Sequence, residues 1–115
     1  MKAAAIAIIA LTISALSATS APDKRQAESH ARQAEYYQRE AASARRDADY
    51  YAREAESARR DALYYIRNGN ASRARSCRER ADRAIYNYRS KIDAARRADD
   101  RAADYLRRAT DALER

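Results

Sequence analysis

The sequence predicts an all-α fold, in which two long helices form an antiparallel coiled-coil hairpin with a seam of alanine and tyrosine. The first observation is a 14-residue repeat: EYYQREAASARRDA at 35–48, DYYAREAESARRDA at 49–62, and a third start, LYYIRN, at 63–68. Fourteen residues are two heptads, the period that keeps one stripe of a helix against a partner helix. The second observation is that Pro22 and Gly69 are the only Pro and Gly of the chain. Strong helix breakers are therefore confined to these two places.

The N-terminus has the pattern of an export signal. Lys2 is followed by an apolar run from Ala3 to Leu16 and then by small residues, which together are typical of a cleavable signal peptide. The run is too short for a comfortable transmembrane helix. We expect a signal peptide at 1–20 and a protein that is secreted, or periplasmic if it comes from a bacterium. Lys24 and Arg25 lie in a short leader, 21–26, as a candidate dibasic processing site.

The first helix is expected over about 23–67, where small residues and tyrosines recur at alternating steps of three and four. It should end at Asn68-Gly69, because Gly readily adopts the left-handed conformation that closes a helix. The predicted stripe of this helix is Ala27, His30, Ala34, Tyr37, Ala41, Ala44, Ala48, Tyr51, Ala55, Ala58, Ala62 and Tyr65.

The second helix is expected over about 71–114, after a turn at 68–70 that is short enough to require an antiparallel hairpin. Facing positions then sum to 139 or 140 in a hairpin domain at 27–115, so that large residues nearly always meet small ones. Arg78 and Asp99 interrupt the predicted stripe, which is Ala71, Ala74, Arg78, Ala81, Ile85, Tyr88, Ile92, Ala95, Asp99, Ala102, Leu106, Ala109 and Leu113.

The charged residues are numerous but interleaved. Beyond residue 20 the chain has 23 basic and 17 acidic residues. Eight acid-to-arginine pairs have the i,i+4 spacing and the order that favour a helix, so most arginines have a structural explanation and the basic excess argues only weakly for nucleic acid. The pairs are Glu28–Arg32, Glu35–Arg39, Asp49–Arg53, Glu56–Arg60, Glu79–Arg83, Asp93–Arg97, Asp104–Arg108 and Asp111–Arg115.

Residue types that carry chemistry are sparse in this sequence. It has no Gly-rich phosphate loop and no catalytic triad, and His30, its only His, is not accompanied by other ligands at metal-binding spacing. We therefore expect no catalytic, cofactor-binding or metal-binding residues, and no enzyme. Cys77, the only Cys, is a candidate for an intermolecular disulfide or a half-buried free thiol. Asn70 begins an N-x-S sequon at the predicted tip and is a candidate glycosylation site in a eukaryotic secretory pathway.

Three functions fit this pattern. The first is a secreted structural or protein-binding module that associates with itself as a dimer of hairpins, with an unidentified protein as a further partner. Tyr36, Tyr50 and Tyr64 are its interface candidates, and Cys77 can link the copies only if their tips lie side by side. The second is a precursor cleaved at dibasic sites to release peptides that contain Tyr-Tyr. The third is a cationic amphipathic protein acting on membranes, for which an alanine face is weak support.

Overall fold

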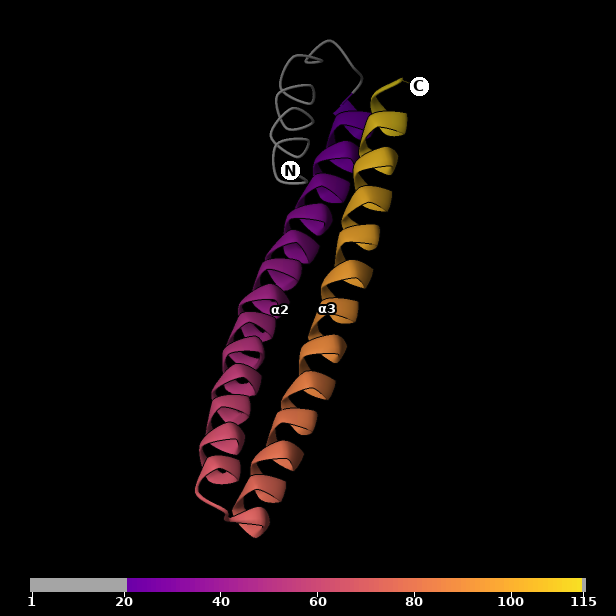
Figure 1. The fold of residues 1–115 in the computed structure, drawn as a ribbon. Coiled ribbons are helices and arrows are strands. Elements are labelled where there is room, and N and C mark those ends of the chain that lie inside the picture. Colours follow the sequence, from indigo (N-terminus) through magenta and orange to yellow (C-terminus); the bar gives the residue numbers. More distant parts are fainter. Residues whose placement is uncertain (1–20, 115) are drawn as a thin grey trace. The chain divides into compact units, whose positions relative to one another are not determined.

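The computed structural model describes residues 21–114 and contains two α-helices (Figure 1). Helix α2 spans Ala21–Arg67 and helix α3 spans Ala71–Glu114. The predicted all-α hairpin is confirmed: the described residues form two long helices that are joined by a tight turn. Residues 21–26, expected as a leader, are part of α2, and the predicted signal peptide at 1–20 lies outside the described residues.

The turn between the helices has a well-defined hydrogen-bond pattern. Gly69 has a φ of +72°, its N–H donates to the carbonyl of Ile66 (3.1 Å), and the N–H of Asn70 donates to the carbonyl of Tyr65 (2.8 Å). This is a Schellman motif with glycine at the left-handed position. Asn70 then caps α3, because its Oδ1 accepts a hydrogen bond from the N–H of Arg73 (3.1 Å). Asn70 thus takes part in both helix ends: its N–H closes the motif that ends α2, and its side chain caps the start of α3.

The helices are organised into two compact units. The described part of the first unit contains residues 21–40 of α2 and 97–114 of α3, which pack side by side. Ala27, Ala112 and Leu113 form a buried cluster there, as expected from facing positions that sum to 139 or 140. The other buried residues of this unit are Ala34, Ala98, Ala102, Leu106 and Ala109.

The second unit contains residues 41–96, including the turn. Within it α2 and α3 again lie side by side (Figure 1), and the buried residues of both helices are small. They are Ala41, Ala44, Ala48, Ala55, Ala58, Ala62, Ala74, Cys77, Ala81, Ala84 and Ala95. The side chain of a buried alanine ends at Cβ, so two helix backbones can approach closely along such a seam.

The predicted stripe of α2 is confirmed, since its alanines are buried and His30, Tyr37, Tyr51 and Tyr65 are half-buried. The stripe of α3 needs a correction. Ala71, Arg78 and Tyr88 are exposed and Asp99 is only half-buried, whereas Cys77, Ala84 and Ala98 are buried. Ala74, Cys77, Ala81 and Ala84 continue the alternation of three- and four-residue steps, so small residues occupy the buried positions. Arg78 then remains exposed to water. Burying an unpaired charge costs far more than this one-residue change of register.

The seam should therefore tolerate larger side chains poorly. We expect Ala48→Leu and Ala55→Leu each to lower the free energy of unfolding by about 1–3 kcal/mol, because both positions are buried against the other helix. Ala52→Leu is the matched control, since Ala52 is exposed on the same helix. Urea denaturation followed by circular dichroism measures the difference, and equal stability of all three variants would contradict the seam described here.

The turn should depend on the backbone of Gly69 rather than on space around it. No atom lies within 4 Å of a Cβ placed at this residue, so a substitution meets no steric contact there. We expect Gly69→Ala to lower the free energy of unfolding by about 1–2 kcal/mol, the cost of a left-handed conformation with a Cβ. Gly69→Asn should cost less, because Asn tolerates this conformation better than Ala does. Thermal unfolding of the two variants provides the comparison, and Ala tolerated as well as Gly would refute it.

Candidate functional site: the tyrosine pairs and the charges beside the seam

Each copy of the repeat places two adjacent tyrosines on α2 in the same way. The ring centroids are 5.1 Å apart in Tyr36–Tyr37, 5.2 Å in Tyr50–Tyr51 and 5.3 Å in Tyr64–Tyr65, with interplanar angles of 77°, 72° and 77°. This edge-to-face geometry is the preferred contact of two aromatic rings. The second tyrosine of each pair is half-buried beside the seam and supports the first one.

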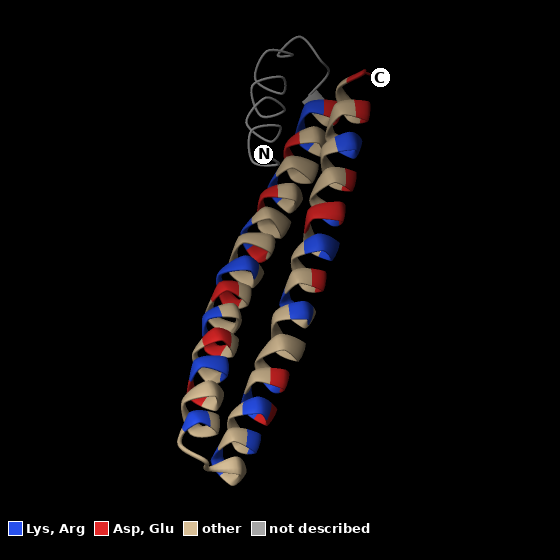
Figure 2. Ribbon diagram, viewed as in Figure 1, with Lys and Arg blue, Asp and Glu red and all other residues tan. Residues whose placement is uncertain are grey.

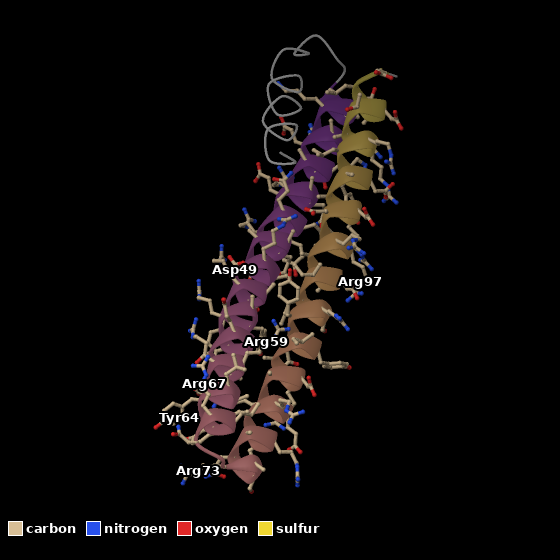
Figure 3. The ribbon with its side chains drawn as sticks, viewed as in Figure 1. Asp49, Arg59, Tyr64, Arg67, Arg73 and Arg97 are labelled. Atoms are coloured by element: carbon tan, nitrogen blue, oxygen red, sulfur yellow. The ribbon has the colours of Figure 1, made fainter. Side chains whose placement is uncertain are left out.

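The first tyrosine of each pair is exposed to solvent. Tyr36, Tyr50 and Tyr64, which we call the tyrosine row, have exposed fractions of 48%, 56% and 61%. In Figure 3, Tyr64 points away from α3. These residues are the interface candidates predicted from the sequence, and a large aromatic ring held at this exposure is available for contact with another molecule.

Arginines of α3 hold two of the half-buried tyrosines. Nη1 of Arg101 donates a hydrogen bond to the hydroxyl of Tyr37 (3.2 Å), and its guanidinium carbon is 5.5 Å from the ring centroid. In the second unit, Nη1 of Arg73 donates to the hydroxyl of Tyr65 (3.3 Å) and the corresponding distance is 5.6 Å. These contacts combine a hydrogen bond with a cation–π interaction. They fix the ring against which the exposed tyrosine packs.

The first unit also contains an aromatic cluster that the sequence did not reveal. The rings of Tyr37 and Tyr105 are stacked with centroids 5.8 Å apart and an interplanar angle of 10°, and His30 lies 6.0 Å from Tyr105. The guanidinium of Arg108 lies 4.9 Å from the centroid of Tyr105. Tyr105 comes directly before Leu106, which belongs to the predicted stripe. The predicted hairpin register could therefore have placed Tyr105 near His30 and Tyr37.

A shallow surface depression of 340 Å³ adjoins this cluster, and it is lined by Asp100, Arg101, Asp104, Tyr105 and Arg108. Arginines and aspartates are balanced along it. Asp104 binds Arg107 and Arg108 through separate carboxylate oxygens, each at 3.0 Å. Asp104 and Arg108 of the lining are thus paired with each other, and the equal numbers of arginines and aspartates give the depression no marked preference for an anion or a cation.

In the second unit, ion pairs between the helices flank the seam. Arg80 of α3 binds Asp61 (2.9 Å) and Glu54 (3.7 Å) of α2, and Lys91 binds Asp47 (3.4 Å). The hydrogen bond to Asp61, together with the negative charges of Asp61 and Glu54, raises the pKa of Arg80, which therefore stays charged. Asp47, Glu54 and Asp61 follow one another at steps of seven residues. This heptad spacing is the sequence signal from which ion pairs with the other helix could have been predicted. Two of the expected i,i+4 pairs are also present, Glu35–Arg39 at 4.0 Å and Asp104–Arg108.

The remaining candidates have the following positions. Cys77 is a free cysteine buried in the seam, so a disulfide to a second copy would require its side chain to leave the seam. Asn70 is half-buried and uses Oδ1 for the helix cap, which leaves Nδ2, the atom that a glycan would modify, outside that hydrogen bond. Lys24 and Arg25 lie in the first turns of α2. Disulfide formation, glycosylation and processing stay predictions.

Within residues 21–114, no three His, Cys, Asp or Glu side chains are grouped in a way that could hold a metal ion. Neither of the described helices has a segment long and apolar enough to cross a membrane. No family model, curated protein or solved structure matches this chain.

The carboxylate of Glu40 should control the titration of Tyr36. The hydroxyl of Tyr36 donates a hydrogen bond to Oε1 of Glu40 (3.1 Å), and this bond, with the nearby negative charge, raises the pKa of Tyr36 above its ordinary value. The neutral phenol is the form that makes the bond, so its small stabilisation is complete below the unfolded pKa of about 10 and is lost as pH rises through the folded pKa.

We therefore expect Glu40→Gln to lower the pKa of Tyr36 toward the ordinary value. Carbon-13 NMR of ring-labelled tyrosine, with resonances assigned by Tyr→Phe variants, measures this pKa in the original chain and in the variant. The other tyrosines serve as internal references. A Tyr36 titration that is the same in both proteins would show that the hydrogen bond does not form in solution.

Proposed function

We propose that this chain is a secreted, non-enzymatic helical-hairpin protein that acts as a structural or protein-binding module and associates with itself. The observation that carries the proposal is the tyrosine row, three exposed rings in one repeated geometry beside an interior of alanines. Tyrosine is enriched at protein interfaces because it offers a large contact area and loses little conformational entropy. The alanine seam buries little apolar surface by itself. A partner that covers the tyrosine row would therefore bury apolar surface that the hairpin alone leaves exposed.

A second copy of the same helix is a suitable partner for this row. Within the second unit, Ser43, Tyr50, Ser57 and Tyr64 occur every seven residues, so large and small side chains alternate along one stripe of α2. Two copies of α2 that lie antiparallel, with the two-fold axis between residues 53 and 54, set Tyr50 against Ser57 and Tyr64 against Ser43. The same pairing sets Arg53 against Glu54. An isologous contact of this kind is typical of homodimers.

The antiparallel arrangement also determines what happens to Cys77. It places the two turns far apart, because each helix runs in the opposite direction to its partner. A disulfide requires Cα atoms within about 7 Å, so this dimer is non-covalent and Cys77 stays reduced in the seam. The alternative with tips side by side, linked through Cys77, is then an outcome of the test.

Sedimentation at micromolar concentration, with and without reductant, tests the self-association. We expect a dimer in both conditions. Tyr50→Ser with Tyr64→Ser should shift the chain toward monomer by at least about ten-fold in the dissociation constant, because two aromatic contacts are lost from each copy. Tyr86→Ser is the matched control, since Tyr86 is exposed on α3 outside the row. A monomer that is fully helical in both conditions would remove the tyrosine row as a self-interface, and a dimer lost on reduction would favour the disulfide-linked form.

Mass spectrometry of the exported product tests the rest of the proposal. We expect one species that begins near residue 21 and extends through both helices. Short peptides that end at Arg45-Arg46 or Arg59-Arg60 would instead identify the chain as a precursor. A chain that is found inside the cell and still carries residues 1–20 would contradict export.

A further inference from the structure

The third copy of the repeat differs from the first two at the hairpin turn. Residues 35–40 read EYYQRE and residues 49–54 read DYYARE, whereas residues 63–68 read LYYIRN. The tyrosine pair and the arginine are kept. The two acids are replaced by Leu63 and Asn68, and the fourth position becomes Ile66. Near the turn, therefore, the repeat loses its negative charges and gains two large apolar side chains.

Only one of these three changes is explained by the fold. Asn68 replaces an acid where α2 ends, and its Nδ2 donates a hydrogen bond to the carbonyl of Tyr64 (2.9 Å). Leu63 and Ile66, in contrast, have exposed fractions of 52% and 53% and do not belong to the seam. They are about 60° apart around the helix, and Tyr64 lies about 100° from Leu63 on the other side. They form an apolar patch separate from the tyrosine row.

The hairpin end that carries this patch has only positive charges between Asp61 and Glu79. Residues 62–78, which we call the tip, contain four arginines and no acid. Figure 2 shows the two helix ends and the turn in blue and tan, without red. The four arginines are Arg67, Arg73, Arg75 and Arg78, and all of them are exposed. Asp61, the acid just before the tip, makes a 2.9 Å ion pair with Arg80, and Glu79, the acid just after the tip, is exposed.

The excess charge of the chain is also concentrated in the unit that contains the tip. Residues 41–96 carry 14 basic and 8 acidic residues, whereas residues 21–40 and 97–114 carry 8 basic and 9 acidic residues. The second unit therefore has a net charge of +6 and the described part of the first unit a net charge of −1. An anionic partner would be attracted to the second unit, and most directly to its acid-free tip.

We propose that the tip is a docking site for an anionic lipid surface. Leu63 and Ile66 would enter the boundary between headgroups and acyl chains, and exposed arginines of the tip would bind headgroup phosphates. Peripheral proteins bind membranes through this combination of buried apolar side chains and electrostatic attraction. A nucleic acid would use the arginines but would leave Leu63 and Ile66 without a role, so the lipid surface is the partner that accounts for both features. This inference is independent of the tyrosine row, because the two surfaces lie on different sides of α2.

Flotation of the full exported chain with lipid vesicles tests the proposal. We expect binding to vesicles of equal parts phosphatidylglycerol and phosphatidylcholine, with little binding to pure phosphatidylcholine and a decrease at high salt. Leu63→Asp with Ile66→Ala restores the second copy's residues at these two positions and should weaken binding by at least about ten-fold. Unchanged binding of this variant, with helicity preserved, would overturn the role of the apolar patch.

A variant of identical composition provides the control for apolar content. Asp49→Leu, Ala52→Ile, Leu63→Asp and Ile66→Ala in one chain move the Leu and Ile from the third copy to the second. Net charge and helix content stay the same, but the apolar pair now lies among acids. We expect this chain to bind anionic vesicles as weakly as the double variant. If this chain binds anionic vesicles as strongly as the original chain does, the apolar content of the chain determines binding, and the position of Leu63 and Ile66 at the tip does not.

Two triple variants separate local from overall charge. Arg73→Gln, Arg75→Gln and Arg78→Gln should weaken vesicle binding by about five-fold per arginine that contacts the surface. Arg83→Gln, Arg89→Gln and Arg96→Gln remove the same charge from the same helix outside the tip and should have a much smaller effect. Equal losses would refute a site at the tip. Binding of a single-stranded oligonucleotide that needs the tip arginines, in a chain that does not float with anionic vesicles, would replace the lipid surface with a polyanion as the partner.

Discussion

The close approach of two helices along alanine is the constraint on which the rest of this structure depends. A seam that consists almost entirely of Ala, with Cys77 as its other small member, brings the backbones near each other in each unit. Apart from Leu106 and Leu113, which are buried, long side chains then lie at the sides of the seam. There they make the contacts that set the two helices in register, such as Arg80 with Asp61 and Glu54 and Arg101 with Tyr37.

The same constraint decides where the apolar surface of the protein lies. Alanines bury little area, and among the large apolar residues of 21–114 only Leu106 and Leu113 are buried. Among residues 21–114, seven large hydrophobic residues are exposed, namely Tyr36, Tyr50, Leu63, Tyr64, Ile66, Tyr86 and Tyr88. A hairpin of this kind gains stability when another molecule covers part of that surface, which is why the two proposals concern interaction surfaces rather than a cleft.

The repeat serves as an internal comparison. Its copies share the Tyr-Tyr pair and the edge-to-face geometry, so differences between copies indicate local roles. Glu40 in the first copy accepts a hydrogen bond from Tyr36, Glu54 in the second pairs with Arg80, and Asn68 in the third closes the helix. Leu63 and Ile66 are the departures that no contact within the hairpin explains.

The sequence by itself determined the two helices, the turn and the stripe of α2, because a strict heptad and a single glycine leave the backbone few alternatives. It also identified the tyrosine row, whose 14-residue spacing places it beside the stripe. Only the tertiary structure decided the seam of α3, where Cys77 and Ala84 replace Arg78 and Ile85 as the buried residues next to Ala74 and Ala81. The pattern allowed either of two adjacent positions, and contact with α2 selected the smaller side chains.

The partners of the charged residues also depended on the tertiary structure. The sequence predicts pairs along one helix, since the i,i+4 spacing can be counted. The pairs of Arg80 and Lys91 cross from α3 to α2, and the cluster of His30, Tyr37 and Tyr105 does so as well. Such contacts depend on the exact register and on which way long side chains turn at the edge of the seam, and neither is specified by the period of the repeat.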